Sequence, residues 1–178
     1  MSKFKNIDRV VRVHIPADME DKNIRVRRLR FSDGLFIMNG LKDEVILNAS
    51  GLSRPIHTSW FSLWWWIKKT FIPAYCIECD SKPIGFIGLY DLKIGESTEI
   101  SLAIFDNSFR RRGYGTRAFK LLALHLQRHS VVRKVRAKVM RDNHHAISFW
   151  RRAGFTKTEP TDDVIITMSM DLNKLSMI

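Results

Sequence analysis

A short basic stretch with two glycines carries the chemistry that stands out most in this sequence. It reads Arg110-Arg111-Arg112-Gly113-Tyr114-Gly115-Thr116 and lies between an apolar run expected to be a strand and an apolar-periodic helix that begins at Tyr114. The glycines let backbone N–H groups turn inward with no Cβ in the way. A helix start offers unpaired N–H groups and the positive end of the helix dipole, and the arginines add full charge. The sequence therefore predicts a site for a phosphate or diphosphate here.

The composition of the 178-residue chain is that of a globular domain, with 45% apolar and 27% charged residues. No apolar run approaches the roughly 18 residues of a membrane helix. Residues 1–12 are polar and basic and lack the apolar segment of a signal peptide, so we expect a cytoplasmic protein that contacts no membrane. The formal net charge of +12 indicates an anionic partner. Nucleic acid, a nucleotide-linked ligand and an acidic surface all fit that charge.

The two cysteines, Cys76 and Cys79, are spaced as Cys-x-x-Cys. A structural zinc site needs four ligands, and no second Cys or His pair lies nearby in the sequence, so we predict no metal site. On a strand, residues i and i+3 point to opposite faces. We therefore expect two ordinary buried or half-buried thiols rather than a redox pair.

Apolar periodicity predicts the order β-α-α-β-β-β-α-β-α-β-β. We expect an N-terminal arm over residues 1–22, one domain over 23–172 and a tail over 173–178. The expected strands are 10–14 in the arm, then 24–29, 75–79, 84–92, 99–105, 135–140, 155–158 and 164–170. The expected helices are 33–39, about 59–69, 114–129 and 143–152, with 42–48 as a further candidate for a short helix that is not counted in this order. This order is typical of the α+β class, α/β layered, with helices on both faces of a mixed sheet.

The glycine junction and a second motif downstream together resemble the GNAT family of acyl-CoA-dependent N-acetyltransferases. The family's central motif is Gln or Arg, two residues, Gly, one residue, then Gly or Ala, and the run from Arg110 to Gly115 matches it. The second motif is Asn, two residues, Ala, two residues, a Leu-Tyr-like pair, three residues and Gly-Phe; here it begins at Asn143 and ends at Phe155. The resemblance covers roughly residues 24–170 and implies a GNAT-like, mostly antiparallel central sheet.

The resemblance implies acetyl-CoA as co-substrate, with no metal. Its diphosphate would lie on backbone N–H groups between Arg111 and Thr116, and its pantetheine arm would lie along the strand that ends near residue 105, like an added strand. In the family, this strand diverges from the next one, here 135–140, and the pantetheine arm binds in the gap between them. Asn143 would hydrogen-bond the pantetheine or nearby backbone, and Trp150 would pack against the thioester. The implied cofactor-binding residues are Ala103, Ile104, Phe105, Arg110, Arg111, Arg112, Gly113, Tyr114, Gly115, Thr116, Asn143 and Trp150.

Acetyl transfer to an amine sets three chemical requirements. The amine must lose a proton, because a free alkylamine has a pKa of roughly 10. The thioester carbonyl must be polarised by N–H donors. The leaving thiolate accepts a proton where one is supplied. For the base we select Glu99, acting directly or through water, with a solvated strand-end carboxylate as the alternative. Trp150 stands where the family often has an acidic Tyr, and an indole gives up no proton at neutral pH. The proton would then come from water or a group such as Tyr90.

Two functions from different classes follow. The first is an acetyl-CoA-dependent N-acetyltransferase acting on a primary amine of a small-molecule or peptide acceptor: an amino-sugar nucleotide, a protein N-terminus, a polyamine or an aminoglycoside. The basic chain favours an anionic acceptor. The second is a non-catalytic GNAT-like module that binds an anionic partner such as RNA; we favour the enzyme, because the sequence contains no nucleic-acid-binding motif. A phosphate-loop hydrolase is disfavoured by the absence of the Gly-Lys-Ser/Thr ending. Family members are often homodimers.

Overall fold

The computed structural model describes residues 18–43, 73–158 and 163–175. Their centre is one eight-stranded sheet in the order β1-β2-β3-β4-β5-β6-β8-β7. Its neighbouring strands are antiparallel except β5 and β6, which are parallel, so the mixed, mostly antiparallel sheet is confirmed. The strands are β1 (Asp18–Asp21), β2 (Ile24–Arg28), β3 (Ala74–Cys79), β4 (Lys82–Lys93), β5 (Ser97–Ile104), β6 (Lys134–Met140), β7 (Thr156–Lys157) and β8 (Ile165–Asp171).

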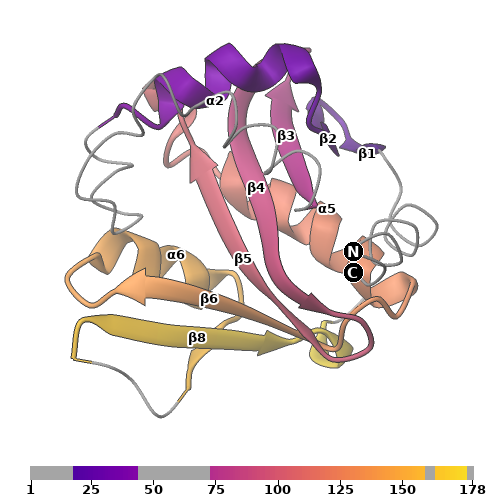
Figure 1. Ribbon diagram of the computed structural model, residues 1–178, viewed down its shortest axis with the longest axis vertical. Helices are drawn as coiled ribbons and strands as arrows, with labels where there is room; N and C mark the ends of the chain where they lie inside the picture. The colour runs from indigo at the N-terminus through magenta and orange to yellow at the C-terminus, as the bar shows by residue number, and fades with distance from the viewer. Residues whose placement is uncertain (1–17, 44–72, 159–162, 176–178) are drawn as a thin grey trace, which may run out of the picture.

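Helices cover both faces of this sheet, as predicted (Figure 1). The helices α5 (Tyr114–Arg128) and α6 (His144–Arg152) share one face and one apolar core, whereas α2 (Gly34–Gly40) packs on the other face over a smaller core. Short 3-10 turns complete the described elements: η1 (Phe31–Asp33), η2 (Asn107–Phe109) and η3 (Leu172–Lys174).

Strand β1 was not predicted from the sequence, and it lies inside the segment that was predicted to be an arm. β1 pairs with β2 from Asp18 opposite Arg27 to Asp21 opposite Ile24. Its single apolar side chain, Met19, is 2% exposed and lies between acidic neighbours, so no alternation of apolar residues announces the strand. The strand expected at 10–14, the helix expected at 59–69 and the part of 42–48 beyond Asp43 lie outside the described residues.

Alternation along β6 separates the core from the opposite face of the sheet. Val135, Ala137 and Val139 are buried in the core shared with α5 and α6. Because side chains alternate along a strand, Lys134, Arg136 and Lys138 lie on the other face. The same alternation in β5 buries Thr98 and Ile100 and leaves Ser97, Glu99 and Ser101 on the face with the β6 cations. This charged face is the one that α2 partly covers.

A buried ion network fixes α2 to the sheet. Arg27 donates from Nε to Oε1 of Glu78 at 2.7 Å and from its two Nη atoms to the carboxylate of Asp33 at 2.8 and 2.9 Å. Hydrogen bonding to Asp33 raises the pKa of Arg27. Burial alone would raise the pKa of Asp33. The hydrogen bonds that Asp33 accepts from Arg27 and from the backbone of Arg30 outweigh this effect, so the pKa of Asp33 is lowered. Removing one partner of such a network costs about 3–5 kcal/mol.

The two cysteines are free and buried, as predicted. Burial raises the pKa of Cys76 to about 12, so that thiol stays protonated and unreactive at neutral pH. Within the described ranges, no helix combines the length and apolar character needed to cross a bilayer.

Candidate active site

The strands β5 and β6 begin as neighbours and then part. Ser97 pairs with Lys134, Thr98 with Val135 and Glu99 with Arg136, and no later residues of the two strands pair. Both strands nevertheless continue, β5 to Ile104 and β6 to Met140. Figure 1 shows β5 rising away while β6 runs across the molecule. Among the described strands, none therefore neighbours the second half of β5 on its β6 side.

Uncapped N–H groups lie where β5 leads into α5. The N-cap residue Gly113 provides no side-chain hydrogen bond, and the first helical bond runs from Arg117 N–H to Gly113 O at 3.0 Å. In the described part of the chain, no side chain or loop carbonyl accepts from the N–H groups of Tyr114, Gly115 or Thr116. The helix contains 15 residues, and its positive dipole end coincides with these donors. This arrangement suits a phosphate or diphosphate.

The two glycines of this junction serve different purposes. Gly113 has φ +84, which L-residues rarely adopt, and a Cβ there would have no atom within 4 Å; it gives the backbone its curvature and leaves open space in front of the helix. Gly115 is buried, and a Cβ there would approach Leu102 Cδ2 to 3.2 Å and Phe149 Cε2 to 3.3 Å. Gly115 therefore lets α5 pack closely against β5 and α6.

The three arginines before the glycines also divide their roles. The Arg110 guanidinium is part-buried and holds the loop together by hydrogen bonds to Ile104 O, Phe105 O, Asn107 Oδ1 and Asp43 Oδ2. Arg111 and Arg112 are exposed, and no hydrogen bond or ion pair engages their side chains among the described residues. The free positive charge beside α5 therefore comes from these two side chains.

Three further implied cofactor residues, Phe105, Asn143 and Trp150, lie in different surroundings. Phe105 follows β5 and packs under α2, where a Cβ on Gly40 would overlap its ring. Asn143 caps α6, its Oδ1 accepting from Ala146 N–H at 3.0 Å; this is a contact to nearby backbone, one of the two alternatives predicted for it. Trp150 is 5% exposed and belongs to an aromatic cluster, its ring centroid 5.7 Å from Phe119, 4.8 Å from Phe149 and 4.7 Å from Phe155.

Glu99 lies where β5 and β6 part. Its Oε2 forms an ion pair with Lys138 Nζ at 2.8 Å, and its side chain is 25% exposed. No described residue donates to its Oε1. Nothing in the sequence indicated that Glu99 lies beside Lys138. Period-two alternation in the sequence indicates which face of a strand each side chain occupies. It does not give the parallel register that brings β5 and β6 together.

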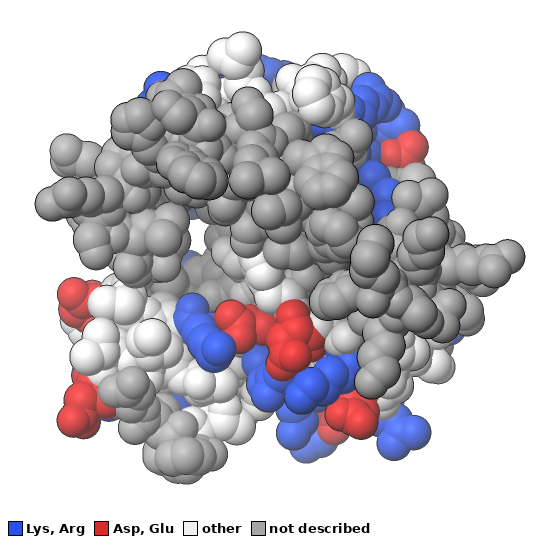
Figure 2. Space-filling view, in the orientation of Figure 1, with Lys and Arg blue, Asp and Glu red and all other residues white. Residues whose placement is uncertain are grey.

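Tyr90 lies across from Glu99 on β4. A Cβ on Gly88 would be 2.9 Å from the Tyr90 hydroxyl, so the ring folds back over that glycine. Burial, together with the nearby charge of Glu99, raises the pKa of Tyr90 to about 12. Its hydroxyl therefore remains a hydrogen-bond donor at neutral pH. In Figure 2, acidic and basic side chains form one band over β6 and the β4–β5 hairpin on this face.

Comparison with known protein families identifies the family of this chain. The model described as the acetyltransferase (GNAT) family matches residues 44–155, which is more than half of the chain. The chain belongs to the GNAT acetyltransferase family. The family resemblance drawn from the two motifs is thereby confirmed, and the chain is an acetyltransferase rather than a phosphate-loop hydrolase.

Solved structures share the fold of this GNAT protein. Spermidine N-acetyltransferase from Vibrio cholerae, in complex with CoA and spermine, superposes with a TM-score of 0.75 at 17% identity, over 86% of this chain and 98% of that one. The ribosomal L7/L12 α-N-protein acetyltransferase RimL, in complex with coenzyme A, gives 0.70 at 16% identity over 88% and 97%. The microcin C7 self-immunity acetyltransferase MccE, with acetyl-CoA and AMP, gives 0.72 at 14% over 89% and 99%. No curated protein sequence matches the chain significantly.

Proposed function

We propose that this protein is an acetyl-CoA-dependent N-acetyltransferase that moves an acetyl group to a primary amine. The observation that carries the proposal is the set of uncapped N–H groups of Tyr114, Gly115 and Thr116 beside the point where β5 loses its neighbour β6. Family membership supports it, as do structural neighbours bound to CoA or acetyl-CoA.

The donor would bind along β5. Its diphosphate would accept hydrogen bonds from backbone N–H groups between Arg111 and Thr116, with Arg111 and Arg112 adding charge. Its pantetheine arm would pair with the open side of β5 at Ala103 and Ile104 in the manner of an added strand. The acetyl group would then lie near Glu99, where β5 and β6 part.

The residues beside that point match the needs of the reaction. The amine nitrogen attacks the thioester carbonyl carbon, a C–N bond forms, and the C–S bond breaks to release CoA. Glu99 would take the amine proton on Oε1, directly or through water, while Lys138 holds Oε2 at 2.8 Å. Tyr90 would donate a hydrogen bond to the developing thiolate, in place of the family's usual Tyr, whose position Trp150 occupies in the core.

The test begins with acetyl-CoA binding by isothermal titration calorimetry, followed by CoA release on adding a panel of primary amines. Gly113→Ala places a Cβ in the open space before the helix and strains φ +84. We expect it to weaken acetyl-CoA binding about 10- to 100-fold, since a hydrogen bond to a charged group contributes about 1.5–3 kcal/mol.

The matched control is Gly95→Ala. Gly95 has φ +77 and equally open surroundings, and it lies in the turn between β4 and β5. Both variants should lose similar stability, and Gly95→Ala should retain acetyl-CoA affinity. The proposal would be overturned if the two variants bound acetyl-CoA with equal affinity. It would also be overturned if RNA stabilised the protein and acetyl-CoA did not.

A further inference from the structure

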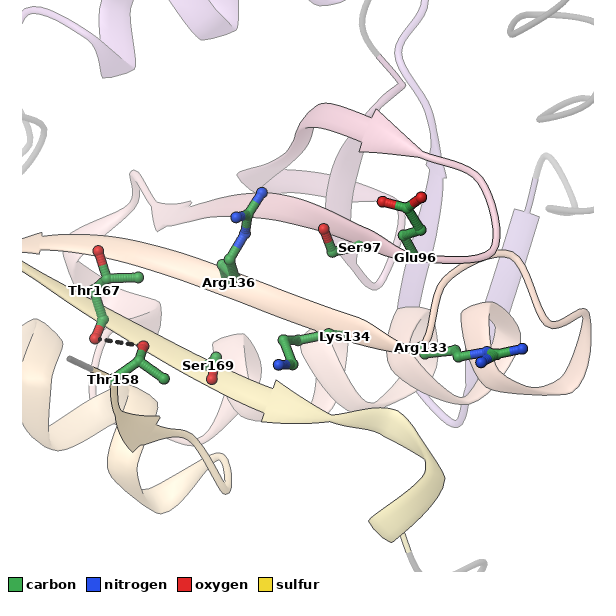
Figure 3. A pocket seen from close by; sticks show the side chains of 8 residues that line it. All are labelled: Glu96, Ser97, Arg133, Lys134, Arg136, Thr158, Thr167 and Ser169. Carbon is green, nitrogen blue, oxygen red and sulfur yellow. Dashed lines mark hydrogen bonds between the residues drawn. The ribbon is translucent and has the colours of Figure 1, made fainter. Parts of the chain in front are cut away.

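A pocket lies on the charged face of the sheet, at the end where β5 and β6 are still paired (Figure 3). Its volume is about 540 Å³, which is in the range of small-molecule sites. Strands β5, β6 and β8 contribute its walls, together with the residues just before β5 and β6 and just after β7. The lining residues are Glu96, Ser97, Arg133, Lys134, Arg136, Thr158, Thr167 and Ser169.

The lining is rich in hydrogen-bond donors and in positive charge. Among the described residues, no ion pair or hydrogen bond engages the side chains of Arg133 and Lys134. Arg136 contacts Asp91 through Nη2 at 3.0 Å, but its Nε is buried and has no hydrogen-bond partner. Ser169 is 8% exposed. In Figure 3 the Lys134 ammonium extends toward Ser169.

The remaining charge in the lining does not cancel these donors. Glu96 is the one carboxylate among the lining residues, set against three cations, of which Arg136 is already paired with Asp91. Figure 3 shows its carboxylate directed away from Lys134. Guanidinium and ammonium groups are those that proteins use to bind phosphate. The pocket is therefore suited to an anion with several acceptor oxygens.

The place of the pocket separates it from the donor site. The eight residues of β5 span roughly 23 Å, with the α5 donors beyond Ile104 and the pocket at Ser97. Ser97 precedes Glu99 by two residues, or about 7 Å along the strand. Arg136 is the register partner of Glu99 itself. An anion in the pocket would therefore lie on the acceptor side of the reaction, close to the candidate base.

We propose that the pocket binds a phosphate group of the acceptor, an inference that rests on the proposed function. The acceptor is then a phosphorylated primary amine whose nitrogen and phosphate are separated by about 7 Å, the two-residue step of a strand, as in an amino-sugar phosphate. Lys134 and the Ser169 hydroxyl donate to the phosphate oxygens, the positive charge of Arg136 adds attraction, and the amine reaches Glu99.

The experiment compares glucosamine 6-phosphate with glucosamine at saturating acetyl-CoA. We expect kcat/KM to favour the phosphorylated amine about 10- to 100-fold, the effect of one or two charged hydrogen bonds. Lys134→Gln should reduce this ratio about tenfold. Lys120→Gln, which removes an exposed lysine from α5 on the opposite face, should leave the ratio unchanged.

The outcomes separate this inference from the proposed function. If the enzyme acetylates amines but the ratio is near one, or if Lys134→Gln keeps the preference, the pocket proposal is wrong while the proposed function stands. If acetyl-CoA does not bind, calorimetric titration of glucosamine 6-phosphate decides the pocket alone: binding lost in Lys134→Gln supports it, and no binding overturns it. Lys134-dependent binding of a single-stranded RNA without binding of the small phosphate would also overturn it.

Discussion

The two ends of the β5–β6 divergence offer hydrogen-bond donors to anions in different ways. At the open end, main-chain N–H groups of Tyr114, Gly115 and Thr116 are held by the helix itself. At the closed end, the donors are side chains on strands that pair with one another, such as Lys134 and Ser169. Main-chain donors lose little entropy on binding, whereas each long side chain must be ordered. The first arrangement suits an invariant cofactor, and the second can change with the acceptor.

This difference makes the two ends separable by experiment. A change at the open end should alter acetyl-CoA binding and spare acceptor discrimination. A change at the closed end should do the reverse. The Gly113 and Lys134 variants test each end directly, and variants of Glu99 and Tyr90 test the boundary between them.

The largest effect is expected at Glu99, between the two ends. Glu99→Gln removes the group that would accept the amine proton, and general-base catalysis contributes about 10²–10⁴-fold. We expect kcat to fall by that factor while the calorimetric Kd for acetyl-CoA stays within about twofold of wild type.

A matched control for this variant is Glu20→Gln. Glu20 is an exposed carboxylate on β1 that pairs with Arg25 at 3.0 Å, as Glu99 pairs with Lys138. It should leave kcat unchanged. Full activity in Glu99→Gln would show that Glu99 is not the base and would support the alternative, a solvated carboxylate at the end of a strand.

A smaller effect is expected at Tyr90. Tyr90→Phe removes the hydroxyl that folds over Gly88, and a hydrogen bond to a developing thiolate is worth about 10- to 100-fold in rate. Because burial raises the pKa of Tyr90 to about 12, the wild-type rate should show no decline from Tyr90 ionisation between pH 7 and about 10, the ordinary pKa of tyrosine. Stopped-flow measurement of CoA release checks both statements, and a rate unchanged in Tyr90→Phe would assign the proton to water.

Much of the open end could be predicted from sequence because it depends on local residues. The helix was expected to begin at Tyr114 and does so. The need for glycine at residue 113 follows from its positive φ. Asn143 was expected at the start of its helix and caps it. Each of these features is decided within a few residues of chain, where capping and turn preferences act.

The closed end could not be predicted because it depends on register between distant strands. Lys134 and Ser169 line one pocket only because β6 pairs with β8, with Arg136 opposite Ser169. Alternation assigns a face to each side chain but not a partner. The structural role of Arg110 could not be predicted either, since one hydrogen-bond partner of its guanidinium is Asp43, 67 residues away in the sequence.

A modest effect is expected from the free arginines of the open end. The double variant Arg111→Gln, Arg112→Gln should raise the Kd for acetyl-CoA about 3- to 10-fold at low salt, with a smaller difference at 0.5 M salt, because exposed charges are screened over about 10 Å or less. The double variant Arg151→Gln, Arg152→Gln, which removes two exposed arginines from the end of α6, is the control. A salt-independent change in both pairs would show a non-specific effect of net charge.

The smallest effect concerns acid stability of the loop before α5. Hydrogen bonds from Lys82 at 2.7 Å and from Ser108 lower the pKa of Asp106 to about 2. A lowered pKa means that these interactions stabilise the fold above the unfolded-state pKa of about 3.9 and lose their effect as pH falls toward 2.

Asp106→Asn should therefore reduce the urea-derived free energy of unfolding at pH 5, and the difference from wild type should shrink progressively below pH 4. Asp142→Asn, at an exposed position outside the loop, should show no such convergence. A difference that persists unchanged in acid would mean that the side-chain amide, rather than the lost charge, weakens the loop that carries the open end.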